Sequence, residues 1–224
     1  MPRAIFQNSL SIFFGVLFLG TLGGQSLAGH RVHNQEQQAH GGETVSWWEY
    51  VTSSDFGQAV MENWQSEYLQ FTLFILATVW LLQRGSPESK ELDKAGTESD
   101  AEQKVGRHAT RRSPAWARAD GVRLWLLSNS LLIVMAAIWL ASWAVQSILG
   151  RVDYNEQQLD HQEAPVSWLA YVGTGDFWNR TFQNWQSEFL AVGSMAVLSI
   201  YLRQRGSPES KPVGAPHDAT GVEG

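Results

Sequence analysis

Long apolar stretches alternate with polar ones along this chain, and they come in the same order twice. Residues 9–29 and 124–149 carry no charged side chain, and each run has the ~20 residues that a helix needs to cross a bilayer. Two further apolar runs are residues 68–82 and 189–202. Each lies in a helical pattern that continues to a stop signal, Gly85 or Gly206, and a proline follows closely in both cases. The pattern predicts an all-α membrane protein with four transmembrane helices.

The second and fourth apolar runs are short for a membrane span. Alone they would reach only ~21–23 Å as helices, against a hydrocarbon core of ~30 Å. Counting back ~20 residues from Arg84 and Arg205 reaches Trp64 and Trp185. We therefore predict spans at about 9–29, 64–83, 124–149 and 185–204, with the two tryptophans at the membrane boundary.

A direct comparison of the two halves explains why the order repeats. Asn-Trp-Gln-Ser-Glu occurs at 63–67 and at 184–188, and Arg-Gly-Ser-Pro-Glu-Ser-Lys occurs at 84–90 and at 205–211. Without any gap, 33 of 83 positions are identical between residues 8–90 and 129–211. We predict two tandem repeats, 8–90 and 123–211. Each has two spans, so both copies enter the membrane in the same sense, as parallel repeats.

The remaining segments are polar and poor in large aliphatic side chains. Residues 91–122 are predicted to be a disordered cytoplasmic linker, and residues 212–224 a disordered tail. A secretory signal peptide is the alternative for the first apolar run, because Arg3 precedes it and Ser26-Leu27-Ala28 resembles a cleavage site. The matching run at 124–149 lies in mid-chain, which favours a membrane anchor in both places.

The basic residues predict the orientation of the spans. Of 16 lysines and arginines, 13 lie at the two ends or between the second and third spans, and 3 lie in the other two loops. The positive-inside rule then predicts that both termini and the linker are cytoplasmic. A content of 17% charged residues and 11 tryptophans agrees with a membrane setting. The chain has no cysteine, which excludes disulfides and thiolate metal sites, and no basic patch that would suggest nucleic acid.

Aromatic residues mark the two outer loops. Trp47 and Tyr50 are three residues apart, and Trp168 and Tyr171 repeat this spacing. Rings on one helical face suit short interfacial helices at the bilayer surface, although packing onto the other helices explains the same pattern. Asp55 and Asp176 are predicted as the N-caps of the helices that follow.

The candidate functional residues lie in the repeated motif. We predict a paired polar site of Asn63, Glu67, Asn184 and Glu188, because ionisable groups near a membrane boundary are costly and commonly functional. The alternative is that these groups meet lipid headgroups while the aromatic residues anchor the interface, namely Trp47, Tyr50, Trp64, Trp168, Tyr171 and Trp185.

The chemistry of the sequence predicts no enzyme. Among His30, His33 and His40, only His40 has a histidine, His161, at the matching position of the second copy, so no metal site is predicted. We find no nucleophile–base set and no phosphate loop, and we predict neither catalytic residues nor a cofactor.

The duplicated motifs resemble a family of bacterial integral membrane proteins classed only as a domain of unknown function, over residues 8–211. The resemblance implies location in the bacterial plasma membrane and a helical architecture, and it implies no catalytic residues. We expect a non-enzymatic multi-pass protein that organises the membrane or envelope, with the lipid bilayer, further copies of itself or other membrane proteins as partners. The alternative is a small transporter or channel with a path between the two repeats.

Overall fold

The computed structural model describes residues 3–223, and all regular structure in this range is helical, with no strand, as predicted. The helices are α1 (Arg3–Gln7), α2 (Ser9–Ala39), α3 (Trp47–Val51), α4 (Ser54–Trp80), α5 (Val122–Ser128), α6 (Ser130–Asp160), α7 (Trp168–Val172) and α8 (Gly175–Tyr201). Two short 3-10 helices, η1 (Gly106–His108) and η2 (Ala115–Arg118), lie between α4 and α5.

Internal contacts divide the chain into two units that do not follow the repeat boundary. The first unit is Met1–Met61 with Val145–Gly173, and the second is Glu62–Ala144 with Thr174–Gly224. Each unit therefore draws segments from both copies. The division into repeats, linker and tail remains a prediction of the sequence.

Two of the four predicted spans meet the length and polarity of a membrane-crossing helix. Within the described residues, these two helices are α2 and α6. Only 6% of the most apolar stretch of α2 is buried, and 17% of that of α6. A core helix of a soluble protein would be mostly buried. Helices α4 and α8 do not qualify, because their first halves are polar and the helices end at Trp80 and Tyr201.

An asparagine at matching positions separates each long apolar helix from a short one before it. Asn8 follows α1 and donates from its side chain to the carbonyl of Ala4, at 2.8 Å. Asn129 follows α5 and donates in the same way to Trp125, also at 2.8 Å. These bonds compete with the helix ladder. The third predicted span, expected from residue 124, is thus broken at Asn129, and α6 begins at Ser130.

Two other helix boundaries differ from the prediction. Helices α2 and α6 continue to Ala39 and Asp160, beyond the predicted span ends at 29 and 149. The N-cap assignments of Asp55 and Asp176 are wrong, because the backbone N–H groups of Phe56 and Phe177 donate to the side chains of Ser53 and Thr174 instead, both at 3.3 Å. The two aspartates lie in the first helical turn, where a carboxylate interacts favourably with the helix dipole.

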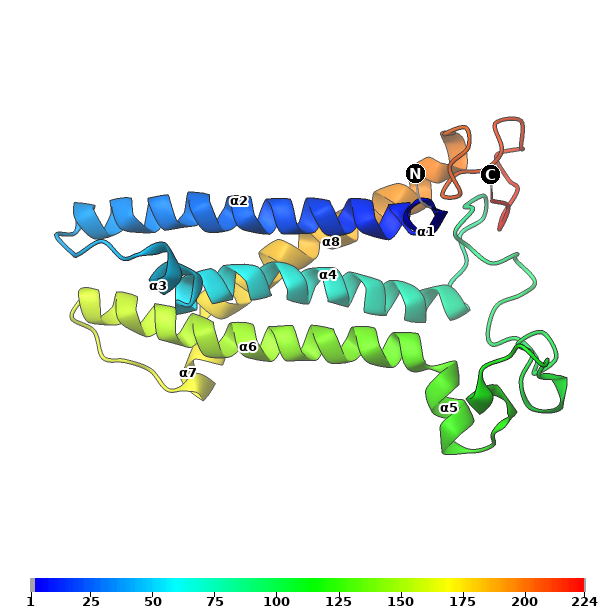
Figure 1. The fold of residues 1–224 in the computed structure, drawn as a ribbon, viewed down its shortest axis with the longest axis horizontal. Coiled ribbons are helices and arrows are strands. Elements are labelled where there is room, and N and C mark those ends of the chain that lie inside the picture. The colour runs from blue at the N-terminus through cyan, green and yellow to red at the C-terminus, as the bar shows by residue number, and fades with distance from the viewer. Residues whose placement is uncertain (1–2, 224) are drawn as a thin grey trace. The chain divides into compact units, whose positions relative to one another are not determined.

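In the first unit, the chain reverses after α2 and after α6 through the same pair of hydrogen bonds (Figure 1). The backbone N–H of Val45 donates to Asn34 Oδ1 at 2.8 Å, and Asn34 Nδ2 donates to the Val45 carbonyl at 3.0 Å. Asn155 and Val166 make the matching bonds at 2.8 and 3.1 Å. We call each such pair of bonds a clasp. It satisfies backbone groups that no helix or strand satisfies here.

Two aromatic contacts hold the short helices α3 and α7 in the same hairpins. The indole N–H of Trp47 donates to Ser26 Oγ at 3.2 Å, and that of Trp168 donates to Ser147 Oγ at 2.9 Å. Tyr50 and Tyr171 are 5% and 0% exposed, and their hydroxyls lie directly against Gly29 and Gly150. Residues that are identical in the two copies thus make identical contacts.

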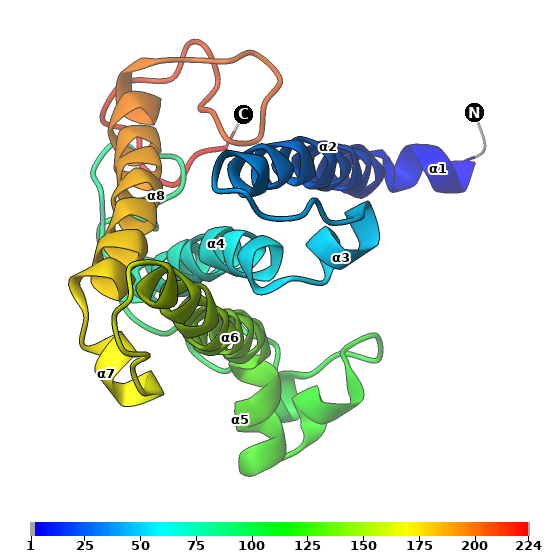
Figure 2. The same cartoon turned by 90° about the vertical axis from the view of Figure 1, so that its left-hand side faces the viewer.

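The segment between α4 and α5 consists of turns and the two 3-10 helices. Helix η2 packs against α5, in the region drawn in green in Figure 2. Disorder of residues 91–122 in solution remains a prediction.

We predict that Gly29→Ala lowers the stability of the protein by about 1–3 kcal/mol, because the added Cβ would collide with the Tyr50 hydroxyl and the packed hairpin must shift. Thermal unfolding of the purified protein in detergent measures this change. Removing the hydroxyl with Tyr50→Phe should recover part of the loss.

Gly24→Ala is the matched control, since it changes a glycine of the same helix that has no atom within 4 Å of the added Cβ. It should be neutral or stabilising by up to about 1 kcal/mol. Equal effects of Gly24→Ala and Gly29→Ala would show that Tyr50 does not pack against Gly29.

Candidate functional site

In the first copy of the Asn-Trp-Gln-Ser-Glu motif, the middle of the motif is buried and its two end residues are exposed. Gln65 and Ser66 are 0% and 1% exposed on α4, whereas Asn63 and Glu67 are exposed. In the second copy, Gln186 and Ser187 are exposed, and Asn184 and Glu188 are half-buried. The two copies therefore do not form equivalent inward-facing sites.

A hydrogen bond joins the two copies within the second unit. The indole N–H of Trp185 donates to Gln65 Oε1 at 2.7 Å. Glu188 also lies close enough to interact with both Ser66 and Glu67. Of the four predicted site residues, the structure thus brings Glu67 and Glu188 together.

An ionic network lies one to two turns before this bond. Arg180 Nε donates to both carboxylate oxygens of Asp176 at 3.2 Å, and Arg180 Nη1 donates to Glu62 Oε1 at 3.4 Å. The Asn184 side chain donates to the Arg180 carbonyl at 2.8 Å. This bond ties the Asn184 side chain to the backbone of its own helix, four residues earlier. The sequence did not indicate the network, because neither Glu62 nor Arg180 is repeated in the other copy.

An aromatic cluster surrounds Trp143 on α6, and the sequence analysis missed it. The Trp143 ring lies 5.9 Å from that of Trp185 and 6.0 Å from those of Phe177 and Trp178. Its indole N–H faces the fully buried Thr181 hydroxyl at 3.5 Å. Trp185 is accordingly a packing residue of this cluster as well as a donor to Gln65.

The other predicted anchors divide into packed and exposed positions. Tyr50 and Tyr171 are buried in their hairpins, so the packing alternative describes them. Trp64 and Trp47 are half-buried, and Trp168 is 43% exposed. The most exposed large apolar side chains on α3 and α7 are Trp48 at 71% and Leu169 at 75%, which occupy the same position in the two copies.

The second repeated motif, Arg-Gly-Ser-Pro-Glu-Ser-Lys, folds into the same turn twice. Ser89 Oγ accepts from the Gln83 backbone N–H at 2.9 Å, and Ser210 Oγ accepts from Gln204 at 2.9 Å. Gly85 and Gly206 have φ of +85° and +79°, a conformation that side chains with a Cβ avoid. We call these two segments the motif turns.

The lysine that ends each motif turn binds the chain that follows it. Lys90 Nζ donates to the Gly96 carbonyl at 2.7 Å and pairs with Glu98. Lys211, only 1% exposed, donates to the carbonyls of Gly85 and His217 at 2.6 and 2.8 Å. Burial lowers the pKa of the Lys211 ammonium. The C-terminal segment thereby covers the first motif turn and leaves the second more exposed.

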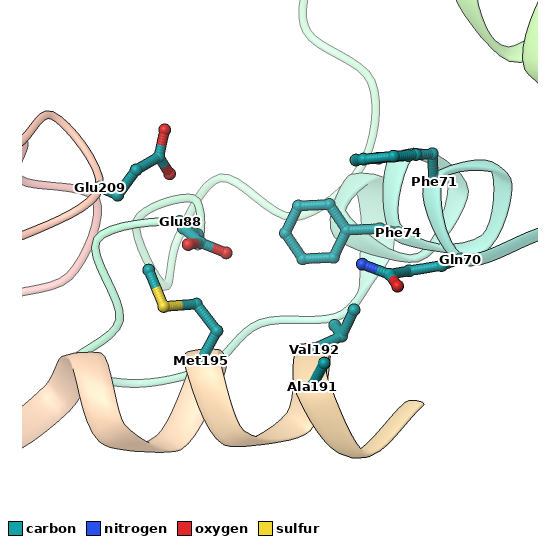
Figure 3. Close-up of a pocket in the computed structure, with 8 residues that line it drawn as sticks. All are labelled: Gln70, Phe71, Phe74, Glu88, Ala191, Val192, Met195 and Glu209. Atoms are coloured by element: carbon teal, nitrogen blue, oxygen red, sulfur yellow. The ribbon is translucent and has the colours of Figure 1, made fainter. Parts of the chain in front are cut away.

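A pocket of about 350 Å³ lies in the second unit, where both motif turns meet the C-terminal halves of α4 and α8. Glu88 and Glu209 come from the two turns, and Figure 3 shows them at one end of the pocket together with Met195. The remaining wall consists of Gln70, Phe71, Phe74, Ala191 and Val192. We call this the carboxylate pocket.

The two carboxylates of the pocket form no ion pair with any described residue. None of the ion pairs among residues 3–223 involves Glu88 or Glu209. Partial burial, and then the charge of Glu209, raise the pKa of Glu88. The part of the chain that the structure describes holds no group of three or more His, Cys, Asp or Glu side chains that could bind a metal ion.

We predict that Glu88→Gln raises the melting temperature of the protein at about pH 7.5 and has no effect at about pH 4. A carboxyl group with a raised folded-state pKa binds more protons in the folded than in the unfolded state, so stability falls as the pH rises above 4.5. Glutamine does not ionise, so the Glu88→Gln protein does not lose this stability as the pH rises. Thermal unfolding of the two proteins across this pH range provides the measurement.

Glu223→Gln, at an exposed position near the C-terminus, is the control and should leave the pH profile unchanged. A melting temperature of Glu88→Gln equal to or below that of the parent at pH ~7.5 would contradict the raised pKa.

Comparison with known proteins places the whole chain in one family. A family model described as "Domain of unknown function (DUF6766)" matches residues 1–222. No curated protein and no solved structure matches the chain. Since the match covers almost every residue, the protein belongs to the DUF6766 family.

Proposed function

We propose that this protein is a non-enzymatic, multi-pass protein of the bacterial plasma membrane that organises the membrane or envelope through its two outward-facing hairpins. Its four spans form two tandem parallel repeats, with both termini and the linker in the cytoplasm. The lipid bilayer, further copies of the chain or other membrane proteins are its partners.

The observation that carries this proposal is the repeated exposure of one apolar position on a fixed hairpin. Trp48 and Leu169 are 71% and 75% exposed, and each belongs to a short helix that a clasp and a tryptophan–serine bond hold in place. A large apolar side chain that the protein itself leaves uncovered is typical of a surface that contacts lipid or protein.

The two apolar helices support a membrane location, and the charge distribution supports the proposed orientation. Helices α2 and α6 are long and apolar enough to cross a bilayer. The 13 basic residues at the ends and in the linker, against 3 elsewhere, favour one orientation. Helices α4 and α8 cross as the partners of α2 and α6 in this proposal, because each hairpin must return to the cytoplasm.

Single cysteines test both the topology and the contact, since the natural chain has none. In intact cells, Trp48→Cys and Leu169→Cys should react with a membrane-impermeant maleimide, while Thr97→Cys in the linker should react only after lysis. A benzophenone maleimide attached at position 48 or 169 should then cross-link to lipid or to a defined protein on illumination.

The same probe at Glu43→Cys, an exposed position in the loop before α3, reports random collisions. Labelling of position 97 in intact cells would contradict the topology. Cross-links from position 48 no more frequent than those from position 43 would contradict the contact surface.

A transporter or channel is the second candidate function, and the carboxylate pocket is the observation that favours it. Carboxylates beside an apolar wall are the kind of group that ion and substrate pathways use. Flux of potassium, protons or amines into liposomes that contain the purified protein distinguishes this role from the first, which predicts no flux above that of empty liposomes.

A further inference from the structure

The carboxylate pocket is negatively charged at one end and apolar over most of its wall. Glu88 and Glu209 supply the charge, and the rings of Phe71 and Phe74 supply much of the apolar surface. A volume of about 350 Å³ falls within the ~300–1,000 Å³ of small-molecule sites. Such a combination matches a ligand that is itself half cationic and half apolar.

One buried polar atom in the wall is unsatisfied. Gln70 Oε1 is shielded from solvent and accepts no hydrogen bond from any of residues 3–223. Figure 3 places Gln70 at the opposite end from the two carboxylates, with the Phe74 ring between them. Gln70 therefore marks the end of the pocket that lies away from the carboxylates.

No cationic side chain among residues 3–223 pairs with the two carboxylates, of which Glu88 is half-buried and Glu209 exposed. The motif-turn lysines, Lys90 and Lys211, donate to backbone carbonyls and so do not neutralise Glu88 or Glu209. Repulsion between the two carboxylates and their contact with apolar groups both favour a positively charged ligand. An ammonium over the face of Phe74 would gain a cation–π interaction in addition.

We propose that the carboxylate pocket binds an amphiphilic amine, whose ammonium group lies between Glu88 and Glu209 and whose apolar chain runs along Phe74 and Val192 toward Gln70. An aminophospholipid and a soluble apolar amine share this chemistry. The proposal does not depend on the role of the outer hairpins.

The proposal is tested by calorimetry, which measures the binding of octylamine to the full chain in nanodiscs of pure phosphatidylcholine. Octylamine should bind saturably, and the double variant Glu88→Gln with Glu209→Gln should bind octylamine at least tenfold more weakly. Octanol, which has the same chain without the charge, should bind at least tenfold more weakly than octylamine. Glu223→Gln is the matched control for loss of one acidic residue and should leave the affinity unchanged.

A second variant fills the pocket without changing its charge. Met195→Trp should also weaken octylamine at least tenfold, and its melting temperature shows whether it has folded. Nanodiscs that include phosphatidylethanolamine identify the source of the ligand: competition with octylamine assigns the site to a lipid, and no competition assigns it to a soluble amine. Equal binding of octanol and octylamine, or unchanged affinity in the double glutamine variant, would overturn the proposal.

Discussion

The hairpins of this protein depend on a side-chain amide that takes the place of a backbone partner. Asn34 and Asn155 each accept from and donate to the backbone of one valine, Val45 or Val166. Loop backbone that leaves a helix must find hydrogen-bond partners or remain in water. The clasp provides them at the point where the loop approaches the preceding helix, and it fixes where α3 and α7 begin.

Apart from the Asn-Trp-Gln-Ser-Glu motif inside α4 and α8, many of the residues that match between the copies lie at such chain reversals. The clasp asparagines, the serine–tryptophan pairs and the glycine–tyrosine contacts form one set at the hairpins, and the motif turns form another. The apolar runs between them have diverged, because many apolar side chains of similar volume serve equally well there. Identity between the copies therefore identifies structural contacts first. The functional features proposed above lie where matching positions face solvent or a pocket, at residues 48 and 169 and at Glu88 and Glu209.

Sequence patterns were sufficient for the helical class, for the two apolar helices and for the short helices of the loops. These features depend on residues that are close together in the sequence, so composition and spacing predict them. Such patterns failed where a partner lies far along the chain: the clasp joins residues 11 apart, and the Trp185–Gln65 bond joins residues 120 apart. The predicted capping by Asp55 and Asp176 failed for a different reason, since Ser53 and Thr174 are equally good caps two residues earlier.

The candidate site illustrates the same limit. Asn63 and Glu67 lie one turn apart as the pattern indicates, but α4 turns Gln65 and Ser66 inward instead. Which face of a helix is buried depends on its neighbours, and in α4 that neighbour is Trp185. The carboxylate pocket could not be predicted either, because it forms only when both motif turns fold back against α4 and α8.

Hydrogen exchange at single amides tests the clasp most directly. In the native protein, the amides of Val45 and Val166 should exchange as slowly as those in the adjoining helices, because each is bound to an asparagine side chain. Glu43 and Ala164, whose amides donate no hydrogen bond among the described residues, should exchange quickly. Exchange of Val45 and Val166 as fast as that of Glu43 and Ala164 would contradict the account that asparagine side chains fix the two hairpins.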